Sequence, residues 1–166
     1  IPDGVVSRDV EYAEKLRAAT VVKGMRRTGK TFLIYGRMKR LVDDGIPLGR
    51  IVHVNFEDER LSRMTMDDLR LIGEVHAELY PEFVDGKTWY FLDELQNVKG
   101  WESYARRLVD SPNVQLCLTF ASSGRSSAIS RSISASYCSG SLHTTAVVTT
   151  WLPSSFSRLM RPRSCQ

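Results

Sequence analysis

The residues with the clearest chemical potential form one short stretch, Gly24-Met25-Arg26-Arg27-Thr28-Gly29-Lys30-Thr31. The pattern Gly-x-x-x-x-Gly-Lys-Thr is typical of a loop that wraps the phosphates of a nucleotide. Its glycines let the backbone turn tightly, so that successive N–H groups point toward phosphate oxygens. Lys30 is expected to reach the β- and γ-phosphates, and the Thr31 hydroxyl to hold Mg²⁺. The whole stretch is therefore predicted to bind nucleotide; the competing interpretation is a glycine-rich turn before a basic helix.

A second group of candidate residues follows the apolar run Tyr90-Phe91-Leu92, which ends directly in Asp93-Glu94. The first carboxylate is expected to hold Mg²⁺, partly through water. The second is expected to polarise an attacking water molecule. Two acids after a strand are usually a solvated turn, so the interpretation depends on their place beyond a phosphate-binding loop. Together the two motifs predict Lys30 and Glu94 as catalytic residues, with Thr31 and Asp93 beside them at a metal ion.

Alternating strands and helices are predicted to position these groups. Val21 and Val22 lie in a β-branched run before the loop, and the helix after it has apolar residues at helical spacing. The apolar face of that helix is expected to comprise Phe32, Leu33, Ile34, Met38, Leu41 and Val42. Strands are predicted at 20–23, 51–56, 88–92 and 114–119, and helices at 7–19, 30–44, 65–79 and 101–109. This alternation predicts an α/β fold with a mostly parallel sheet flanked by helices.

At these motifs the chain resembles prokaryotic AAA+-type P-loop ATPases that usually carry a C-terminal domain of unknown function. The resemblance covers about residues 5–120. It rests on the Gly-x-Arg-Arg-x-Gly-Lys-Thr loop, Val54-Asn55-Phe56-Glu57-Asp58, Phe91-Leu92-Asp93-Glu94-Leu95-Gln96-Asn97-Val98 and Gly100-Trp101-Glu102. It implies a RecA-like core, in which the 114–119 strand lies between the strands of Val21 and Tyr90. It also implies ATP and Mg²⁺ as ligands.

The resemblance suggests roles for further residues. Thr119 ends a strand where such enzymes place a polar sensor of the γ-phosphate, with Ser122 behind it; capping of a turn is the alternative for each. Arg26 and Arg27 are candidates to contact nucleotide or a neighbouring subunit, or they form a solvated basic turn. Gln96 and Trp101 are candidates to organise the site, although Trp101 also fits a core anchor. Glu57 and Asp58 are secondary candidates.

Composition places the chain among globular proteins, with 42% hydrophobic and 25% charged residues. No apolar run approaches the ~20 residues needed to span a bilayer, and no secretory signal opens the sequence. A cytoplasmic protein without a membrane partner is therefore expected. The three cysteines have no metal-type spacing, which favours free thiols.

The basic character of the chain is confined to its last third. Residues 1–110 have a net charge of −1, whereas residues 111–166 contain five Arg and no Lys, Asp or Glu. Nucleic-acid binding by the folded part is thus only weakly supported. From 121 to 166 there are 14 serines and little periodicity, although 144–151 could form one more strand.

We therefore divide the chain into a P-loop ATPase core at 1–120 and a Ser/Arg-rich segment at 121–166. That segment is a basic tail, an out-of-frame or truncated remainder of the ATPase domain, or a divergent end. The leading functional prediction is an ATP-binding, Mg²⁺-dependent ATPase module, with self-association or a protein partner as further possibilities. The alternatives are a nucleotide-binding module without significant turnover and a small P-loop kinase.

Overall fold

A computed structural model of the chain describes residues 19–121 and 146–151. These residues form a five-stranded sheet in the order β2-β3-β4-β1-β5. The strands are β1 (Ala19–Gly24), β2 (Ile51–Asn55), β3 (Thr88–Asp93), β4 (Val114–Ala121) and β5 (Ala146–Trp151). The helices are α1 (Lys30–Asp43), α2 (Met66–Leu79) and α3 (Trp101–Asp110). Short 3₁₀ turns occupy Leu48–Arg50, Glu59–Leu61, Pro81–Phe83 and Leu95–Asn97.

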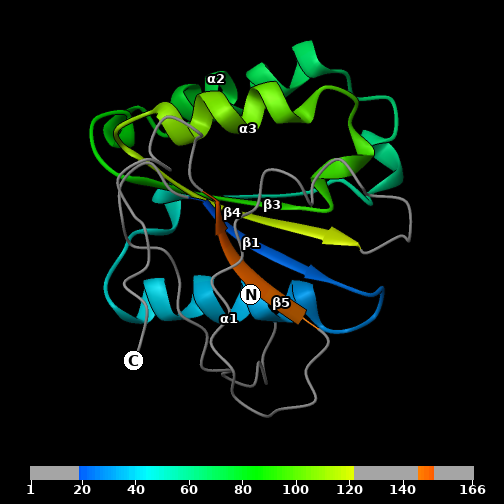
Figure 1. The fold of residues 1–166 in the computed structure, drawn as a ribbon. Helices are drawn as coiled ribbons and strands as arrows, with labels where there is room; N and C mark the ends of the chain where they lie inside the picture. The colour runs from blue at the N-terminus through cyan, green and yellow to red at the C-terminus, as the bar shows by residue number, and fades with distance from the viewer. Residues whose placement is uncertain (1–18, 122–145, 152–166) are drawn as a thin grey trace, which may run out of the picture.

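The helices cover both faces of the sheet, with α1 on one side and α2 and α3 on the other (Figure 1). Because both faces are covered, β3 is buried along its whole length, as its continuous apolar sequence predicts. The core on the α1 side includes Val22, Leu33, Ile34, Met38 and Phe91. The larger core on the other side includes Leu69, Leu92, Leu108, Leu118 and Phe120.

Local sequence signals set where the helices begin. The chain enters α1 through Gly29, with φ of 82°, and α3 through Gly100, with φ of 77°; both angles favour glycine. The helix α2 begins with a capping box, in which Thr65 accepts a hydrogen bond from the Asp68 N–H and Asp68 accepts one from the Thr65 N–H.

The sheet confirms the predicted topology. The strands β1, β4, β3 and β2 run parallel, and β4 lies between β1 and β3, as the resemblance implied. Ala146–Trp151 pairs antiparallel with β1, at the place where one more strand was considered. The predicted helix at 7–19 lies almost wholly outside the described residues, as does most of the 121–166 segment.

One prediction about α1 is wrong. Phe32 was assigned to the apolar face of the helix, but it is 58% exposed, whereas the neighbouring Leu33 and Ile34 are buried. The physical reason is helical phase: at about 100° per residue, position 32 lies on the side of α1 opposite the buried Ile34, Met38 and Leu41. No helix in the described ranges is long and apolar enough to cross a membrane.

Candidate functional site

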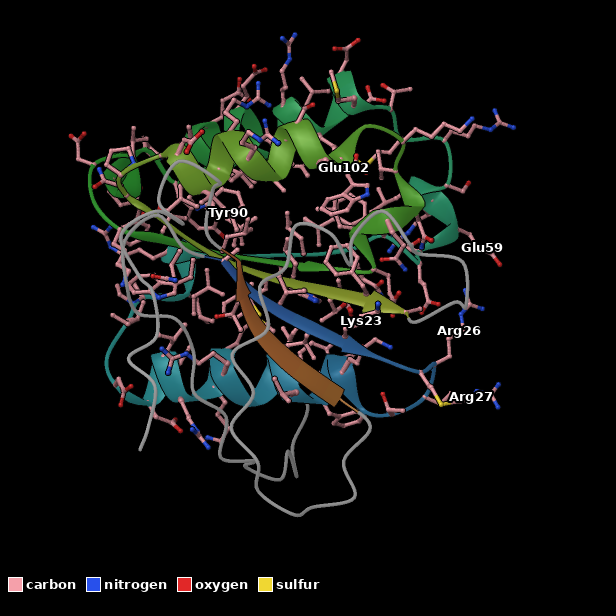
Figure 2. The ribbon with its side chains drawn as sticks, viewed as in Figure 1. Lys23, Arg26, Arg27, Glu59, Tyr90 and Glu102 are labelled. Atoms are coloured by element: carbon pink, nitrogen blue, oxygen red, sulfur yellow. The ribbon has the colours of Figure 1, made fainter. Side chains whose placement is uncertain are left out.

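The candidate site lies where β1 and β3 end, at the carboxyl edge of the parallel sheet. Between these strands runs β4, so the sheet brings together the loop after Gly24, the acids after Leu92 and the end of β4. Ligands of open α/β sheets bind in crevices outside these strand ends. Figure 2 shows Arg26 and Arg27 on the loop that follows β1, at the rim of this edge.

The loop from Gly24 to Thr31 has the compact shape that its sequence predicts. Arg27 has φ of 63° and Gly29 has φ of 82°, and such left-handed residues bend the backbone sharply. The Thr28 hydroxyl donates a hydrogen bond of 2.8 Å to the Met25 carbonyl, which closes the turn. The loop therefore leads into α1 with the helix N-terminus facing the crevice, where N–H groups and the helix dipole favour an anion.

Lys30 connects the loop to the end of β3. Its ammonium donates to the Met25 carbonyl at 3.0 Å and lies 3.1 Å from Glu94 Oε1. The side chains are only 4% and 7% exposed, for Lys30 and Glu94 respectively. A buried cation is stable only when it is paired and hydrogen-bonded, and these contacts meet that condition.

Asp93 and Thr31 form the second contact between the loop and β3. The Thr31 hydroxyl donates a hydrogen bond of 2.7 Å to Asp93 Oδ2. Thr119, which is fully buried in β4, donates to Asp93 Oδ1 and accepts a hydrogen bond of 2.9 Å from the Glu94 N–H. Thr119 therefore holds both acids at once from the strand between the loop and β3.

The position of the Glu94 carboxylate is fixed by the backbone conformation of Glu94 and by contacts of both carboxylate oxygens. Its φ of 56° lies in the left-handed region that few non-glycine residues adopt. The Oε2 atom accepts hydrogen bonds from Gln96 Nε2 at 2.5 Å and from the Ala121 N–H at 2.9 Å. The Oε1 atom faces Lys30. The carboxylate is thus oriented by three different elements.

A pocket of about 580 Å³ opens over these groups, lined by Arg26, Arg27, Gly29, Lys30, Thr31, Phe32, Glu57 and Glu94. Two of these side chains form an ion pair, in which Arg26 Nη2 lies 3.5 Å from Glu57 Oε1, and both are substantially exposed. The pocket therefore has cations, a helix N-terminus and one buried carboxylate on its walls. This combination suits a polyphosphate.

The structure brings most of the predicted site residues together. Arg26, Arg27, Gly29, Lys30, Thr31 and Glu94 line the pocket, and Asp93 contacts Thr31 beside it. Four predicted residues do not line the pocket: Gly24, Met25, Thr28 and Thr119. Met25 and Thr28 close the loop by a hydrogen bond, and Thr119 of β4 hydrogen-bonds to the acids. Of the secondary candidates, Glu57 lines the pocket, whereas Asp58 pairs with Arg60.

Sequence reasoning missed two features of the site. Phe32 lines the pocket, although its apolar type at helical spacing had suggested a core position. The N–H of Ala121 binds Glu94, which no side-chain pattern could reveal. For Phe32, the signal in the sequence is its place directly after Lys30-Thr31 of the loop.

The oxygen atoms of the site fit a Mg²⁺ ion whose other ligands are phosphate and water oxygens. Mg²⁺ commonly takes only one or two protein oxygens at such sites. The Thr31 hydroxyl and Asp93 Oδ2 supply two adjacent oxygens, 2.7 Å apart. Among the residues that the structure describes, no group of three or more His, Cys, Asp or Glu side chains could hold a metal by itself.

Comparison with known proteins agrees with this geometry. The profile of the AAA domain family matches residues 16–156 and so continues past residue 120, where the resemblance in the sequence had ended. The chain is 30% identical over 107 residues to the uncharacterized protein MJ1544 of Methanocaldococcus jannaschii, covering 64% of this chain and 22% of that protein. It is 28% identical over 99 residues to an uncharacterized protein of Haemophilus influenzae, covering 60% and 24% of the two chains.

The chain thus spans about a quarter of the length of these curated relatives. No solved structure matches it significantly. The family profile covers most of the chain, including the loop, both acids and β5. The chain belongs to the AAA domain family of P-loop proteins, and its nucleotide-binding, ATPase-like fold follows from that membership.

Proposed function

We propose that this chain is a module that binds ATP with Mg²⁺ and hydrolyses its terminal phosphoanhydride bond. The observation that carries the proposal is the buried contact of 3.1 Å between Lys30 and Glu94 across the pocket. It joins a phosphate-binding cation to a carboxylate able to activate water, and the Thr31–Asp93 contact of 2.7 Å lies beside it.

In this proposal the loop from Gly24 to Thr31 binds the polyphosphate. Its N–H groups and the N-terminus of α1 donate to phosphate oxygens, while Lys30 neutralises charge on the β- and γ-phosphates. Arg26 and Arg27 add positive charge at the rim of the pocket. Thr31 and Asp93 would hold Mg²⁺, which when bound neutralises charge on the phosphates.

Glu94 is the proposed general base. When Lys30 turns to the phosphates it leaves Glu94 Oε1, while Gln96 and the Ala121 N–H still hold Oε2. Oε1 can then accept a proton from water as the water oxygen bonds to the γ-phosphorus. The bond from the γ-phosphorus to the bridging oxygen breaks, and ADP leaves with the electron pair.

The second candidate is a module that binds nucleotide without significant turnover. It is favoured by the same three contacts of Glu94, because a carboxylate that stays paired with Lys30 is a weaker base toward water. An arginine supplied by a partner would then be needed for fast hydrolysis, since such an arginine is worth ~10³–10⁵ in rate.

The test compares Mg·ATP binding and hydrolysis by the unaltered chain with those of Lys30→Ala and Glu94→Gln. We expect Lys30→Ala to weaken binding about 10- to 100-fold, the range for a lost charged hydrogen bond. We expect Glu94→Gln to keep binding and to lower kcat about 10²- to 10⁴-fold.

Two surface substitutions provide matched controls. Lys39→Ala and Glu78→Gln make the same charge changes at exposed positions of α1 and α2. Equal losses in the controls would contradict the assigned roles. Binding without hydrolysis in the unaltered chain would favour the second candidate, and absence of binding would refute both.

A further inference from the structure

Phe32 is an exposed aromatic residue that lines the same pocket as the phosphate-binding groups. It is 58% exposed and shares the pocket wall with Gly29, Lys30 and Thr31. Successive residues of an α-helix are about 100° apart around the axis. The side chains at 30, 31 and 32 therefore diverge: the first contacts Glu94, the second contacts Asp93, and the third is exposed on the pocket wall.

We propose that the Phe32 ring is the subsite for the nucleobase of the bound nucleotide. This inference rests on the proposed function and adds the element that distinguishes a nucleotide from a bare polyphosphate. The terminal phosphate lies at Glu94 in that proposal, so the nucleoside must leave the pocket on the side away from the acids. Of the residues lining the pocket, Phe32 is the aromatic one.

Helix geometry places the ring where a base would lie. Side chains of an α-helix lean toward its N-terminus, so the Phe32 ring covers the first turn of α1. The N–H groups of that turn are the ones that face the phosphates. A base connected to those phosphates through a ribose can therefore reach the ring without leaving the pocket.

A second aromatic residue supports the ring from one side. Tyr35 packs edge-to-face with Phe32, with ring centroids 6.2 Å apart and an interplanar angle of 77°. Tyr35 in turn packs against His53 of β2, at 5.5 Å and 68°. These contacts restrain the Phe32 side chain, and its exposure leaves ring surface open for stacking. A side chain that is already restrained loses less conformational entropy when a ligand binds.

Stacking on an aromatic ring also defines the expected ligand class. Every base has a flat π-face, so stacking tolerates different bases and favours those with larger rings. We expect purine nucleoside triphosphates to bind more tightly than pyrimidine ones, with little difference between adenine and guanine.

The experiment measures calorimetric affinities for Mg·ATP and for Mg·tripolyphosphate, which lacks both base and ribose. We expect Phe32→Ala and Phe32→Leu to weaken Mg·ATP binding about 5- to 100-fold. Phe32→Trp should retain affinity because it keeps an aromatic face. Tripolyphosphate affinity should stay within about twofold in all three variants. Leu48→Ala, at a residue 64% exposed and outside the pocket, is the control.

The outcomes separate this inference from the proposed function. Equal weakening of both ligands by Phe32→Ala would overturn the inference, because the residue would then act on the phosphate loop itself. Unchanged ATP affinity would also overturn it, while leaving the phosphate site intact. Failure of the unaltered chain to bind either ligand would refute the proposed function, and this inference with it.

Discussion

At the scale of single residues, Thr119 organises the site without lining the pocket. Its hydroxyl donates to Asp93 and accepts from the Glu94 N–H, and the side chain is fully buried. The resemblance suggested a sensor of the γ-phosphate at this position. Its contacts also support a positioning role, because the hydroxyl uses its proton and one lone pair on the two acids.

We expect Thr119→Val to lower the free energy of unfolding by about 1–3 kcal/mol. The substitution keeps the shape but leaves a buried N–H and a carboxylate oxygen without their partner. Thr119→Ser keeps the hydroxyl, so it should lower the free energy of unfolding much less. Urea denaturation of the three chains tests this, and a Val variant as stable as the unaltered chain would show that the two hydrogen bonds contribute little.

At the scale of elements, one contact between α1 and β2 is made by a partly buried histidine. His53 of β2 stacks edge-to-face with Tyr35 of α1, and its Nε2 has no hydrogen-bond partner among the described residues. Burial lowers the pKa of His53 below its usual 6.5, although the negative charge of Asp93 opposes part of this effect. Protonation of the ring thus opposes the docking of α1, the helix that presents Lys30, Thr31 and Phe32.

We expect the folded chain to lose stability as the pH falls below 6.5, the pKa of an unperturbed histidine. Below that pH the unfolded state binds a proton at His53 that the folded state binds less readily, so acid favours unfolding. The His53→Gln variant should show a weaker pH dependence in this range. An NMR titration of His53 at or above pH 6.5 would contradict the expected direction.

At the scale of the whole molecule, the central position of β4 makes the fold depend on distant parts of the chain. β1 and β3 do not pair with one another; each pairs with β4, along Ala19–Gly24 and Thr88–Leu92 respectively. β5 covers the other edge of β1. The proposed boundary near residue 120 therefore separates the four parallel strands from the antiparallel one.

We expect a chain ending after Ala121 to unfold cooperatively, although it is less stable because β1 becomes an edge strand. A chain ending after Asp110 lacks β4, so β1 and β3 lose their shared partner and cooperative unfolding should disappear. Urea denaturation followed by circular dichroism tests both. A cooperative transition in the shorter chain, or none in the longer, would show that β4 does not define the core.

Local sequence was sufficient for much of the fold and for the identity of the candidate groups. The Gly-x-x-x-x-Gly-Lys-Thr stretch, the apolar run before Asp93 and the alternation of strands and helices depend on neighbours in the chain. Hydrophobic periodicity and turn chemistry are properties of such short segments. For that reason the parallel α/β fold and the helix starts were predictable from them.

The sequence by itself therefore determined which residue types are available for phosphate chemistry, and in which elements they lie. Only the tertiary structure decided how they meet: Lys30 with Glu94, Thr119 with both acids, and Phe32 on the pocket wall rather than in the core. Phe32 lies on the face of α1 opposite its buried residues, and the packing of the helix on the sheet decides which face is covered. The contacts of Lys30 and Thr119 with the acids join residues 25 to 64 positions apart, and they arise from strand order, which short-range patterns do not encode.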